Sequence, residues 1–180
     1  MNTFFIADQH FYHSNILNFL KEDGQNLREG FSTINDMNDH IIKSHNSVVN
    51  KNDKVYFLGD VIMKKSAWMY EIIQEMNGEK ILIRGNHDNA KLNIYAKYFK
   101  DVRATHGMKT SNHRRLCLSH IPIHVDSLGD AFNIHGHLHH KEINDYRYIN
   151  VGCELLNYIP ISIQGVSEMI EKRILENGTT

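Results

Sequence analysis

The sequence predicts an α/β fold, and two patterns predict it. Along the first half of the chain, short apolar runs typical of buried strands alternate with segments whose apolar residues recur at helical spacing. Each apolar run also ends in a polar cluster, and the carboxyl ends of strands are where open α/β sheets place their binding sites. The expected order in this half is therefore strand, helix, strand, helix, strand, with two helices expected between the first two strands.

The first half contains three expected strands and three expected helices. The strands are expected at residues 3–7, 54–58 and 80–84. The helices are expected at residues 14–20, 33–49 and 66–76. Ser14 and Ser66 are the expected N-caps of the first and third helices, because a serine hydroxyl accepts a hydrogen bond from the first helical turn. Residues 21–31 are polar and contain glycine, so we expect a loop there.

The second half is expected to form strands joined by short loops, followed by one helix. The strands are expected at residues 102–106, 114–119, 131–135 and 146–151. The last helix is expected at residues 165–175. The sequence contains no repeat, low-complexity tract or linker, so a single domain is expected over residues 1–180.

Composition argues against several classes of partner. A chain of 180 residues suits one domain with a hydrophobic core, and its net charge of −1 predicts no strong attraction to nucleic acid or to a membrane. Its two cysteines suit a reducing compartment, so a cytoplasmic location is expected. We expect no signal peptide, because the N-terminal apolar run reaches Asp8 too soon. We expect no membrane span, because no apolar run approaches the roughly 20 residues that a span needs. The sequence indicates no oligomeric state.

Histidine is the outlier in the composition, with 13 copies against two prolines. Five of the histidines lie in short polar strings, most of which also contain aspartate, asparagine or glycine. The strings are Asp8-Gln9-His10, Gly59-Asp60, Gly85-Asn86-His87-Asp88, Ser119-His120 and Gly136-His137-Leu138-His139. Together they offer carboxylate, amide and imidazole groups sufficient to hold two divalent cations that share one carboxylate.

Each string taken alone has a structural alternative. Asp8 is also a turn-forming residue, and Asp60 or Asp88 is also suited to capping a helix. A single histidine at a strand end, such as His120, is more often a hydrogen-bonded structural residue than a ligand. The order of the strings and their shared placement at strand ends favour the metal site over these alternatives.

Taken together, the strings resemble the full motif series of the calcineurin-like metallophosphoesterases. The series spans residues 8–139. The resemblance implies a four-layer α/β/β/α sandwich that uses nearly the whole chain, with a dinuclear metal site at the strand ends. It also implies an enzyme, a metal-dependent hydrolase of phosphate esters.

The resemblance implies a role for each matching position. One ion would be bound by Asp8, His10 and His139, and the other by Asn86, His120 and His137. Asp60 would bridge the two ions. His87 would be the catalytic histidine, which binds no metal and donates a proton to the leaving group.

One departure from the family pattern affects the binding of the phosphate. Many members carry an arginine three residues after the bridging aspartate, where this chain has Met63. The string over residues 8–15 also resembles a compact bacterial and phage-type branch, in which a histidine at the position of residue 13 lies near the site. Arg28 and Arg84 are candidates to replace the missing arginine. The candidate substrate contacts are thus His13, Arg28, Arg84 and His124.

The expected ligand set is a mixture of nitrogen and oxygen atoms, which favours Mn²⁺, with Fe, Zn²⁺, Ni²⁺ or Co²⁺ as alternatives. The small chain has no basic stripe with interleaved aromatic residues, which argues against a processive nuclease. We expect a phosphodiester or nucleotide-like small substrate rather than a phosphoprotein. The enzymatic alternative is a general phosphomonoesterase. The non-enzymatic alternative is a scaffold of the same family that binds partner proteins, although such scaffolds typically lose ligands that this chain retains.

Overall fold

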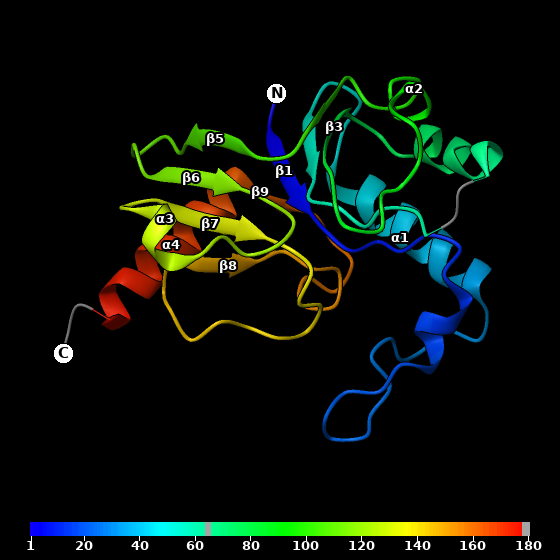
Figure 1. Ribbon diagram of the computed structural model, residues 1–180, viewed down its shortest axis with the longest axis horizontal. Helices are drawn as coiled ribbons and strands as arrows, with labels where there is room; N and C mark the ends of the chain where they lie inside the picture. The colour runs from blue at the N-terminus through cyan, green and yellow to red at the C-terminus, as the bar shows by residue number, and fades with distance from the viewer. Residues whose placement is uncertain (64–65, 178–180) are drawn as a thin grey trace.

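Two β-sheets form the centre of the computed structural model, which describes residues 1–63 and 66–177 (Figure 1). The first sheet has the strand order β4 (Asp101–Arg103), β3 (Glu79–Ile83), β2 (Lys54–Phe57), β1 (Thr3–Ile6) and β9 (Ile161–Ser162). The second has the order β5 (His106–Lys109), β6 (Arg115–Leu118), β7 (Phe132–His135) and β8 (Tyr148–Asn150). Strands β1 to β4 are parallel, as are β6 to β8, whereas β9 and β5 are antiparallel to their neighbours.

The central strands of the first sheet are buried on both faces. Phe4 and Ile6 of β1 pack into one apolar cluster, and Phe5 and Ala7 pack into the other. Successive side chains of a strand point to opposite faces, so a strand covered on both sides has a continuous apolar sequence. This explains the unbroken apolar runs that predicted these strands.

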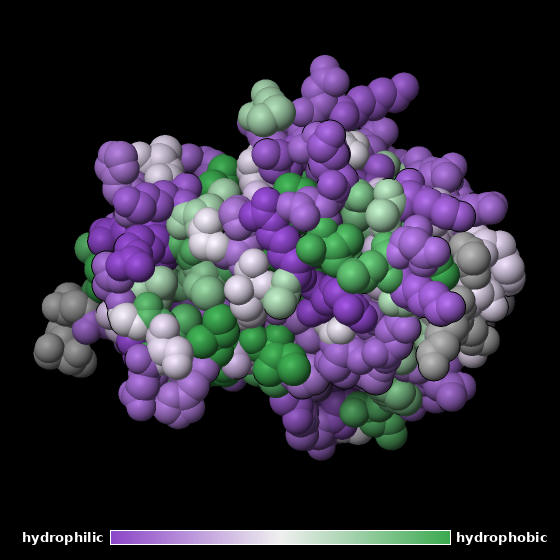
Figure 2. Space-filling view, turned by 45° about the horizontal axis from the view of Figure 1, so that its top comes forward, coloured by the Kyte–Doolittle hydropathy of each residue, from purple (hydrophilic) through white to green (hydrophobic). Residues whose placement is uncertain are grey.

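Helices cover the outer face of the first sheet, and a further helix packs at its other side. The cluster on the outer face includes residues from α1 (Ile34–Val48), the 3₁₀ helix η2 (Ala67–Glu75) and α2 (Leu92–Tyr95). The cluster between the sheets includes Val166 and Ile170 of α4 (Ile163–Asn177). Two sheets flanked by helices confirm the predicted α/β/β/α class. Hydrophilic residues cover most of the face shown in Figure 2.

Most of the expected elements are confirmed, with ends that differ by no more than two residues. Two expected helices, at 14–20 and 66–76, are instead the 3₁₀ helices η1 (Ser14–Asn18) and η2. The predicted N-cap Ser14 is wrong, because His13 holds that position, and Ser66 holds the cap position of η2 without a side-chain hydrogen bond. A short segment that lacks a side-chain cap does not offset the cost of starting an α-helix, which explains the tighter, shorter form.

One expected strand, at residues 102–106, is divided between the two sheets. Strand β4 ends at Arg103 in the first sheet, and β5 begins at His106 in the second. The short elements α2, α3 (Val125–Leu128) and β9 were not predicted. Elements of four residues or fewer are too short to show a periodic pattern, and the change of sheet leaves no mark in the apolar pattern.

The two sheets are joined at one edge by the segment that follows β1. The backbone of Ala7 accepts from the N–H of Cys153 at 3.0 Å and donates to the carbonyl of Val151 at 2.9 Å. The carboxyl ends of β1 and β8 therefore meet, and the loops that follow the parallel strands of both sheets converge there. Among the described residues, no helix is long and apolar enough to span a bilayer.

Candidate metal centre

The loops at this shared edge bring the predicted ligands together in two groups. The first group is Asp8, His10 and His139, and the second is Asp60, His120 and His137. Within each group, one potential ligand atom from every residue lies within 4.8 Å of the others. The residues come from the loops after β1, β2, β6 and β7, so the two parallel sets of strands jointly build the site.

Asp60 lies between the two groups. Its Oδ2 atom is 3.3 Å from Nε2 of His120 and 3.9 Å from Nε2 of His10. Its Oδ1 atom accepts a hydrogen bond from the backbone N–H of His87 at 2.8 Å. A carboxylate in this position has one oxygen turned towards both groups, which is the arrangement that a bridging ligand requires.

Asn86 joins the second group. Its Oδ1 atom is 2.9 Å from Nε2 of His120, and Nδ1 of His137 is 3.3 Å from the same nitrogen. An amide oxygen, two imidazole nitrogens and the Asp60 carboxylate therefore surround one position. This is the donor set that the family resemblance implies for the second ion, together with the bridging aspartate.

His87 lies at the rim of the site, with 46% of its side chain exposed. Its Nε2 atom is 4.0 Å from Oδ2 of Asp60, and its ring centre is 6.0 Å from that of His10. An exposed imidazole beside two buried groups of ligands can meet a substrate while remaining outside either group. This placement suits a proton donor better than a ligand.

Unusual backbone conformations are concentrated in these loops. Left-handed backbone is found in five of the predicted ligands, with φ angles of 60° at Asp8, 53° at His10, 53° at Asp60, 71° at His137 and 53° at His139. Such conformations are uncommon for residues other than glycine and cluster at functional sites, where the surrounding structure must hold them in place. The chain therefore turns sharply at the points where it presents these side chains.

Asp88 holds two of these loops together. Its buried carboxylate accepts backbone hydrogen bonds from Asp60 at 2.9 Å, Val61 at 3.1 Å and Gly85 at 2.8 Å. The alternative role in capping the next helix is wrong, because Lys91 is the N-cap of α2. Asp88 instead fixes the loop that carries Asp60 against the loop that carries Asn86 and His87.

The glycines of the motifs permit close contact between loops. A Cβ atom at Gly85 would lie 2.2 Å from Oδ1 of Asp60, and one at Gly59 would lie 2.5 Å from Nδ1 of His120. Real Cβ atoms do not approach other atoms so closely, and the Asp60 and His120 side chains belong to the site itself. Any larger residue at either glycine would therefore displace a predicted ligand.

The buried polar atoms of the first group fit a cation. Oδ1 of Asp8 and both ring nitrogens of His10 are buried and make no hydrogen bond. Burying such atoms without a partner is costly, and a metal ion would satisfy Oδ1 of Asp8 and one ring nitrogen of His10. Burial raises the pKa of Asp8 to about 7 and lowers the pKa of His10 well below its usual range. His10 is therefore neutral, as a metal ligand must be.

Hydrogen bonds from outside the two groups orient the rings. Nδ1 of His120 lies 2.8 Å from the carbonyl oxygen of Leu58, and Nδ1 of His139 lies 3.0 Å from Oε1 of Glu154. When Nδ1–H donates to these oxygens, Nε2 is left with a lone pair directed at the site. Such contacts select the ring tautomer that binds metal.

With the geometry established, comparison with known proteins identifies the family. Residues 1–164 match the model of the calcineurin-like phosphoesterase family. The chain belongs to the calcineurin-like phosphoesterases. This family is metal-dependent, which agrees with the two groups of potential ligands at the strand ends.

Two proteins without an assigned function are similar to nearly the whole chain. The uncharacterized protein MJ1445 of Methanocaldococcus jannaschii is 33% identical over 94% of this chain and 91% of its own length. A crystal structure of the protein of unknown function AQ665 from Aquifex aeolicus matches 93% of this chain and 98% of its own, with 26% identity and a TM-score of 0.73. A structure described as a novel archaeal phosphodiesterase matches 84% of both chains with 18% identity and a TM-score of 0.49.

Glu154 is the residue of this phosphoesterase site that sequence reasoning missed. It is buried behind His139, where burial raises its pKa but the charge of Arg28 and the hydrogen bond with His139 outweigh burial and lower the pKa to about 2. A signal existed, because Glu154 shortly follows strand β8 in the same way that other site residues follow their strands.

Arg28 does not lie where a substrate contact must lie. It is 2% exposed, and its guanidinium donates to Oε1 of Glu154 at 2.8 Å, to the carbonyl of Gln9 at 2.8 Å and to the carbonyl of Asp8. These contacts put Arg28 behind the ligand loop and away from the open side of the site. The prediction of a substrate contact is corrected, and Arg28 instead supports the loop after β1.

The other three candidate substrate contacts differ in their distance from the metal groups. The ring centre of His13 is 5.4 Å from that of His10, so His13 borders the site. Arg84 is exposed, and its guanidinium donates to the carbonyl of Asp88 at 2.6 Å. His124 caps α3, which lies beside the beginning of β7 and away from the end of β7 where the ligands lie (Figure 1). The structure therefore favours His13 over His124, and the guanidinium of Arg84 is held by its own loop.

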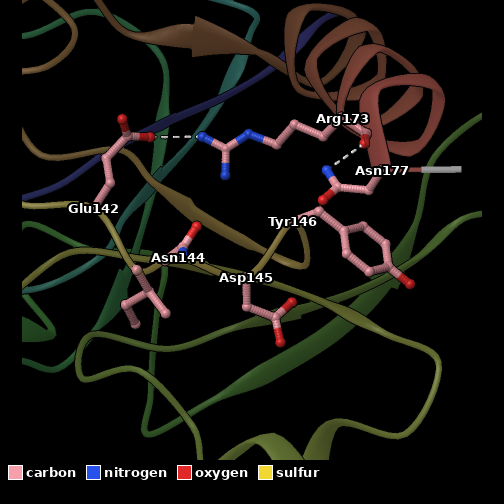
Figure 3. A pocket seen from close by; sticks show the side chains of 7 residues that line it. Glu142, Asn144, Asp145, Tyr146, Arg173 and Asn177 are labelled. Atoms are coloured by element: carbon pink, nitrogen blue, oxygen red, sulfur yellow. Dashed lines mark hydrogen bonds and ion pairs between the residues drawn. The ribbon is translucent and has the colours of Figure 1, made fainter. Parts of the chain in front are cut away.

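A separate hollow of about 330 Å³ lies between α4 and the loop before β8 (Figure 3). The guanidinium of Arg173 projects into it but donates to Glu142 at 2.6 Å and to the carbonyl of Tyr148 at 2.5 Å. The cationic group of the hollow is thus already paired with other groups of the protein. We place the functional site at the strand ends and not in this hollow.

Proposed function

We propose that this calcineurin-like phosphoesterase hydrolyses phosphodiesters at a dinuclear metal centre. The observation that carries the proposal is the position of Asp60, whose Oδ2 atom faces both groups of potential ligands at 3.3 and 3.9 Å. The proposed ligands are Asp8, His10 and His139 for one ion, Asn86, His120 and His137 for the other, and Asp60 for both. The family match and the two-sheet core both extend over most of the chain, which supports a single domain.

Two divalent ions bound there would supply a water molecule of lowered pKa and would neutralise charge on the phosphate oxygens. The chain contributes the rest of the chemistry. His87 donates the proton that the leaving oxygen requires, and its exposed ring can reach an oxygen above the site. The hydrogen bond from the backbone N–H of His87 to Oδ1 of Asp60 fixes the loop that carries His87 against the shared carboxylate.

Mn²⁺ is the proposed native metal. Imidazole nitrogens outnumber carboxylates in the proposed donor set, and mixed nitrogen and oxygen ligation suits Mn²⁺, Fe, Zn²⁺, Ni²⁺ or Co²⁺ better than Mg²⁺ or Ca²⁺. The affinity of such a site rises from Mn²⁺ through Fe²⁺ and Co²⁺ to Ni²⁺, so occupancy by Mn²⁺ depends on which metals are available.

The shortage of cationic side chains supports a diester over a monoester. Position 63 holds methionine where many family members have an arginine, and Arg28 is buried behind the site. A phosphomonoester carries up to one more negative charge than a diester near neutral pH, so it gains more from a nearby cation. A site with few cationic side chains therefore loses less binding energy with the singly charged diester than with the monoester.

The test compares two substrates with the same leaving group in Mn²⁺-loaded protein. We expect bis(p-nitrophenyl) phosphate to be cleaved with a kcat/KM at least equal to that for p-nitrophenyl phosphate. Removal of metal with a chelator should abolish both activities, and Mn²⁺, Ni²⁺ or Co²⁺ should restore them. A monoester preference of roughly tenfold or more, about 1.4 kcal/mol, would favour the phosphomonoesterase. Hydrolysis by rigorously metal-free protein would exclude the proposal altogether.

A further inference from the structure

A cavity of about 540 Å³ opens beside the proposed metal centre. Two of its lining residues, His137 and His139, are proposed metal ligands. The remainder of the lining is largely apolar and includes Phe19, Leu20 and Leu138. Binding sites for small molecules typically combine such apolar walls with a few convergent polar groups. A substrate held by its phosphate at the metals can therefore extend directly into this space.

A small hairpin in the loop after η1 shapes the cavity. The N–H of Leu27 donates to the carbonyl of Phe19 at 2.7 Å, and Leu20 pairs with Asn26 in an antiparallel bridge. These contacts hold the apolar side chains at the base of the hairpin, where Phe19 is 44% exposed and Leu20 is 64% exposed. Two adjacent large apolar residues with this exposure gain from being covered.

The tip of the hairpin is tied to the loop that carries the histidines. The Glu22 carboxylate lies 2.9 Å from Nε2 of His140 and also forms an ion pair with Lys141. These contacts close one side of the cavity. The Glu22 carboxylate also pairs with the ammonium of Lys141 at the edge of the cavity, so the cavity offers little to a second phosphate or to another anion.

Aromatic rings connect the cavity to the metal centre. The ring of His13 is 5.4 Å from that of His10 and 5.5 Å from that of Phe19, centre to centre. Phe19 meets His13 edge to face, with an interplanar angle of 85°. Only the ring of His13 separates Phe19 from the proposed ligand His10. A planar group attached to the phosphate would therefore lie close to the ring of Phe19.

We propose that this cavity binds a flat aromatic group, such as an aryl ring or a nucleobase, carried by the ester group that stays on phosphorus. The inference rests on the proposed phosphodiesterase function and names its substrate class. His87 is not among the described residues that line the cavity, so the leaving oxygen at His87 and the retained group in the cavity occupy different places. Phe19 is the residue that recognises the ring, through stacking and apolar contact.

The experiment uses p-nitrophenyl diesters that share one leaving group and differ in the retained group. With phenyl p-nitrophenyl phosphate we expect kcat/KM to exceed that for methyl p-nitrophenyl phosphate by roughly tenfold, mostly through KM, as one stacked ring commonly contributes. Phe19→Ala should remove most of this preference, because it should lower kcat/KM for the phenyl diester far more than kcat/KM for the methyl diester. Leu175→Ala, at an exposed apolar residue of α4, is the matched control and should keep the preference.

A binding measurement separates this inference from the proposed function. Calorimetry on the Mn²⁺-loaded protein should show phenylphosphonate binding roughly tenfold more tightly than methylphosphonate, with the difference lost in Phe19→Ala. If neither diester is cleaved but this binding difference is found, the proposed function fails and the cavity assignment stands. Equal binding of the two phosphonates, or equal kcat/KM for both diesters, would overturn the cavity assignment. If Phe19→Ala does not fold, Phe19→Leu, which keeps an apolar side chain but removes the ring, should likewise lower the preference.

Discussion

At the scale of single residues, the site combines strained backbone with groups that have separate tasks. Asp8, Asp60 and His137 are held in left-handed backbone, and Asp88 and the motif glycines hold their loops together. His87 lies at the rim of the site, with 46% of its side chain exposed. A change at His87 should therefore affect chemistry, whereas a change at Asp60 should affect metal binding.

We predict that His87→Ala retains both metal ions and lowers turnover by roughly 10²–10⁴, the usual share of a positioned proton donor. The loss should be smaller for substrates with good leaving groups, which need little protonation. Asp60→Ala should lower metal content as well as turnover, because both groups of ligands lose their shared carboxylate. Metal content per chain, measured beside turnover for both variants, checks the assignment. Loss of metal in His87→Ala with full occupancy in Asp60→Ala would reverse the two roles.

The pair formed by Glu154 and Arg28 leads to a second prediction at this scale. Glu154→Gln preserves the size of the side chain but removes the charge that orients His139 and pairs with the buried Arg28. We expect metal affinity to fall by roughly 10–100-fold, as is usual when the partner of a ligating histidine is lost. Breaking a buried ion pair should also cost about 3–5 kcal/mol of stability.

Metal titration followed calorimetrically and urea unfolding of the metal-free protein measure these two effects separately. Glu142→Gln is the matched control, because Glu142 also pairs with an arginine but is 56% exposed. It should change neither quantity by more than a small amount. Unchanged metal affinity in Glu154→Gln would show that Glu154 has no role in positioning His139.

At the scale of elements, helix α1 shows which features are readable in a sequence. It begins with a capping box, in which Thr33 accepts from the N–H of Asp36 at 3.1 Å and Asp36 accepts from the N–H of Thr33 at 2.8 Å. The helix spans fifteen residues, which is long enough for the helical spacing of its apolar residues to predict it from the sequence. The short elements α2, α3 and β9 exist because neighbouring parts of the fold hold them, and no local pattern marks them.

Helix α1 also buries His45, which leads to a prediction about pH. Its Nε2 atom is 3.0 Å from the carbonyl of Asn77, and burial lowers its pKa from 6.5 to about 4. The unfolded chain therefore binds a proton near pH 6.5, whereas the folded chain does not until near pH 4. Stability that is fully present above pH 6.5 is lost as the pH falls through this window, by about 2 kcal/mol at pH 5.

Urea unfolding of metal-free protein at pH 7.5 and pH 5 checks this prediction, with His45→Gln as the comparison. The variant is expected to be less stable at pH 7.5, because it loses the stacked contact with Phe57. Its stability should decline less between the two pH values than that of the natural protein. Equal declines in the two proteins would show that His45 does not titrate in this range.

At the scale of the whole molecule, the proposed centre lies where the two sheets meet. Ligands of the first group come from the loop after β1 in one sheet and the loop after β7 in the other. The backbone N–H of His137 donates to Oδ2 of Asp8 at 2.9 Å across this junction. Metal ions bound there would link the sheets in the folded state, and the unfolded chain has no such site.

We therefore predict that Mn²⁺ raises the melting temperature of the chelator-treated protein. At a metal concentration of about 100 times Kd, one site contributes about 2.7 kcal/mol. For a chain of this length that corresponds to roughly 5–10 °C. Differential scanning calorimetry with and without Mn²⁺ measures the shift, and Asp60→Asn should reduce it. A melting temperature that does not respond to Mn²⁺ in the natural protein would argue against a metal centre at this junction.

The sequence by itself determined the α/β class, the buried strands and the set of residues that converge at the strand ends. It could do so because an apolar run reports burial on both faces of a strand, and because each ligand string directly follows such a run. Only the tertiary structure decided that Asp60 faces both groups, that Arg28 lies behind the site and that Glu154 supports His139. Arg28 and Glu154 are separated by 126 positions in the chain. Their contact depends on how the two sheets pack, and a local pattern of residues carries no record of that packing.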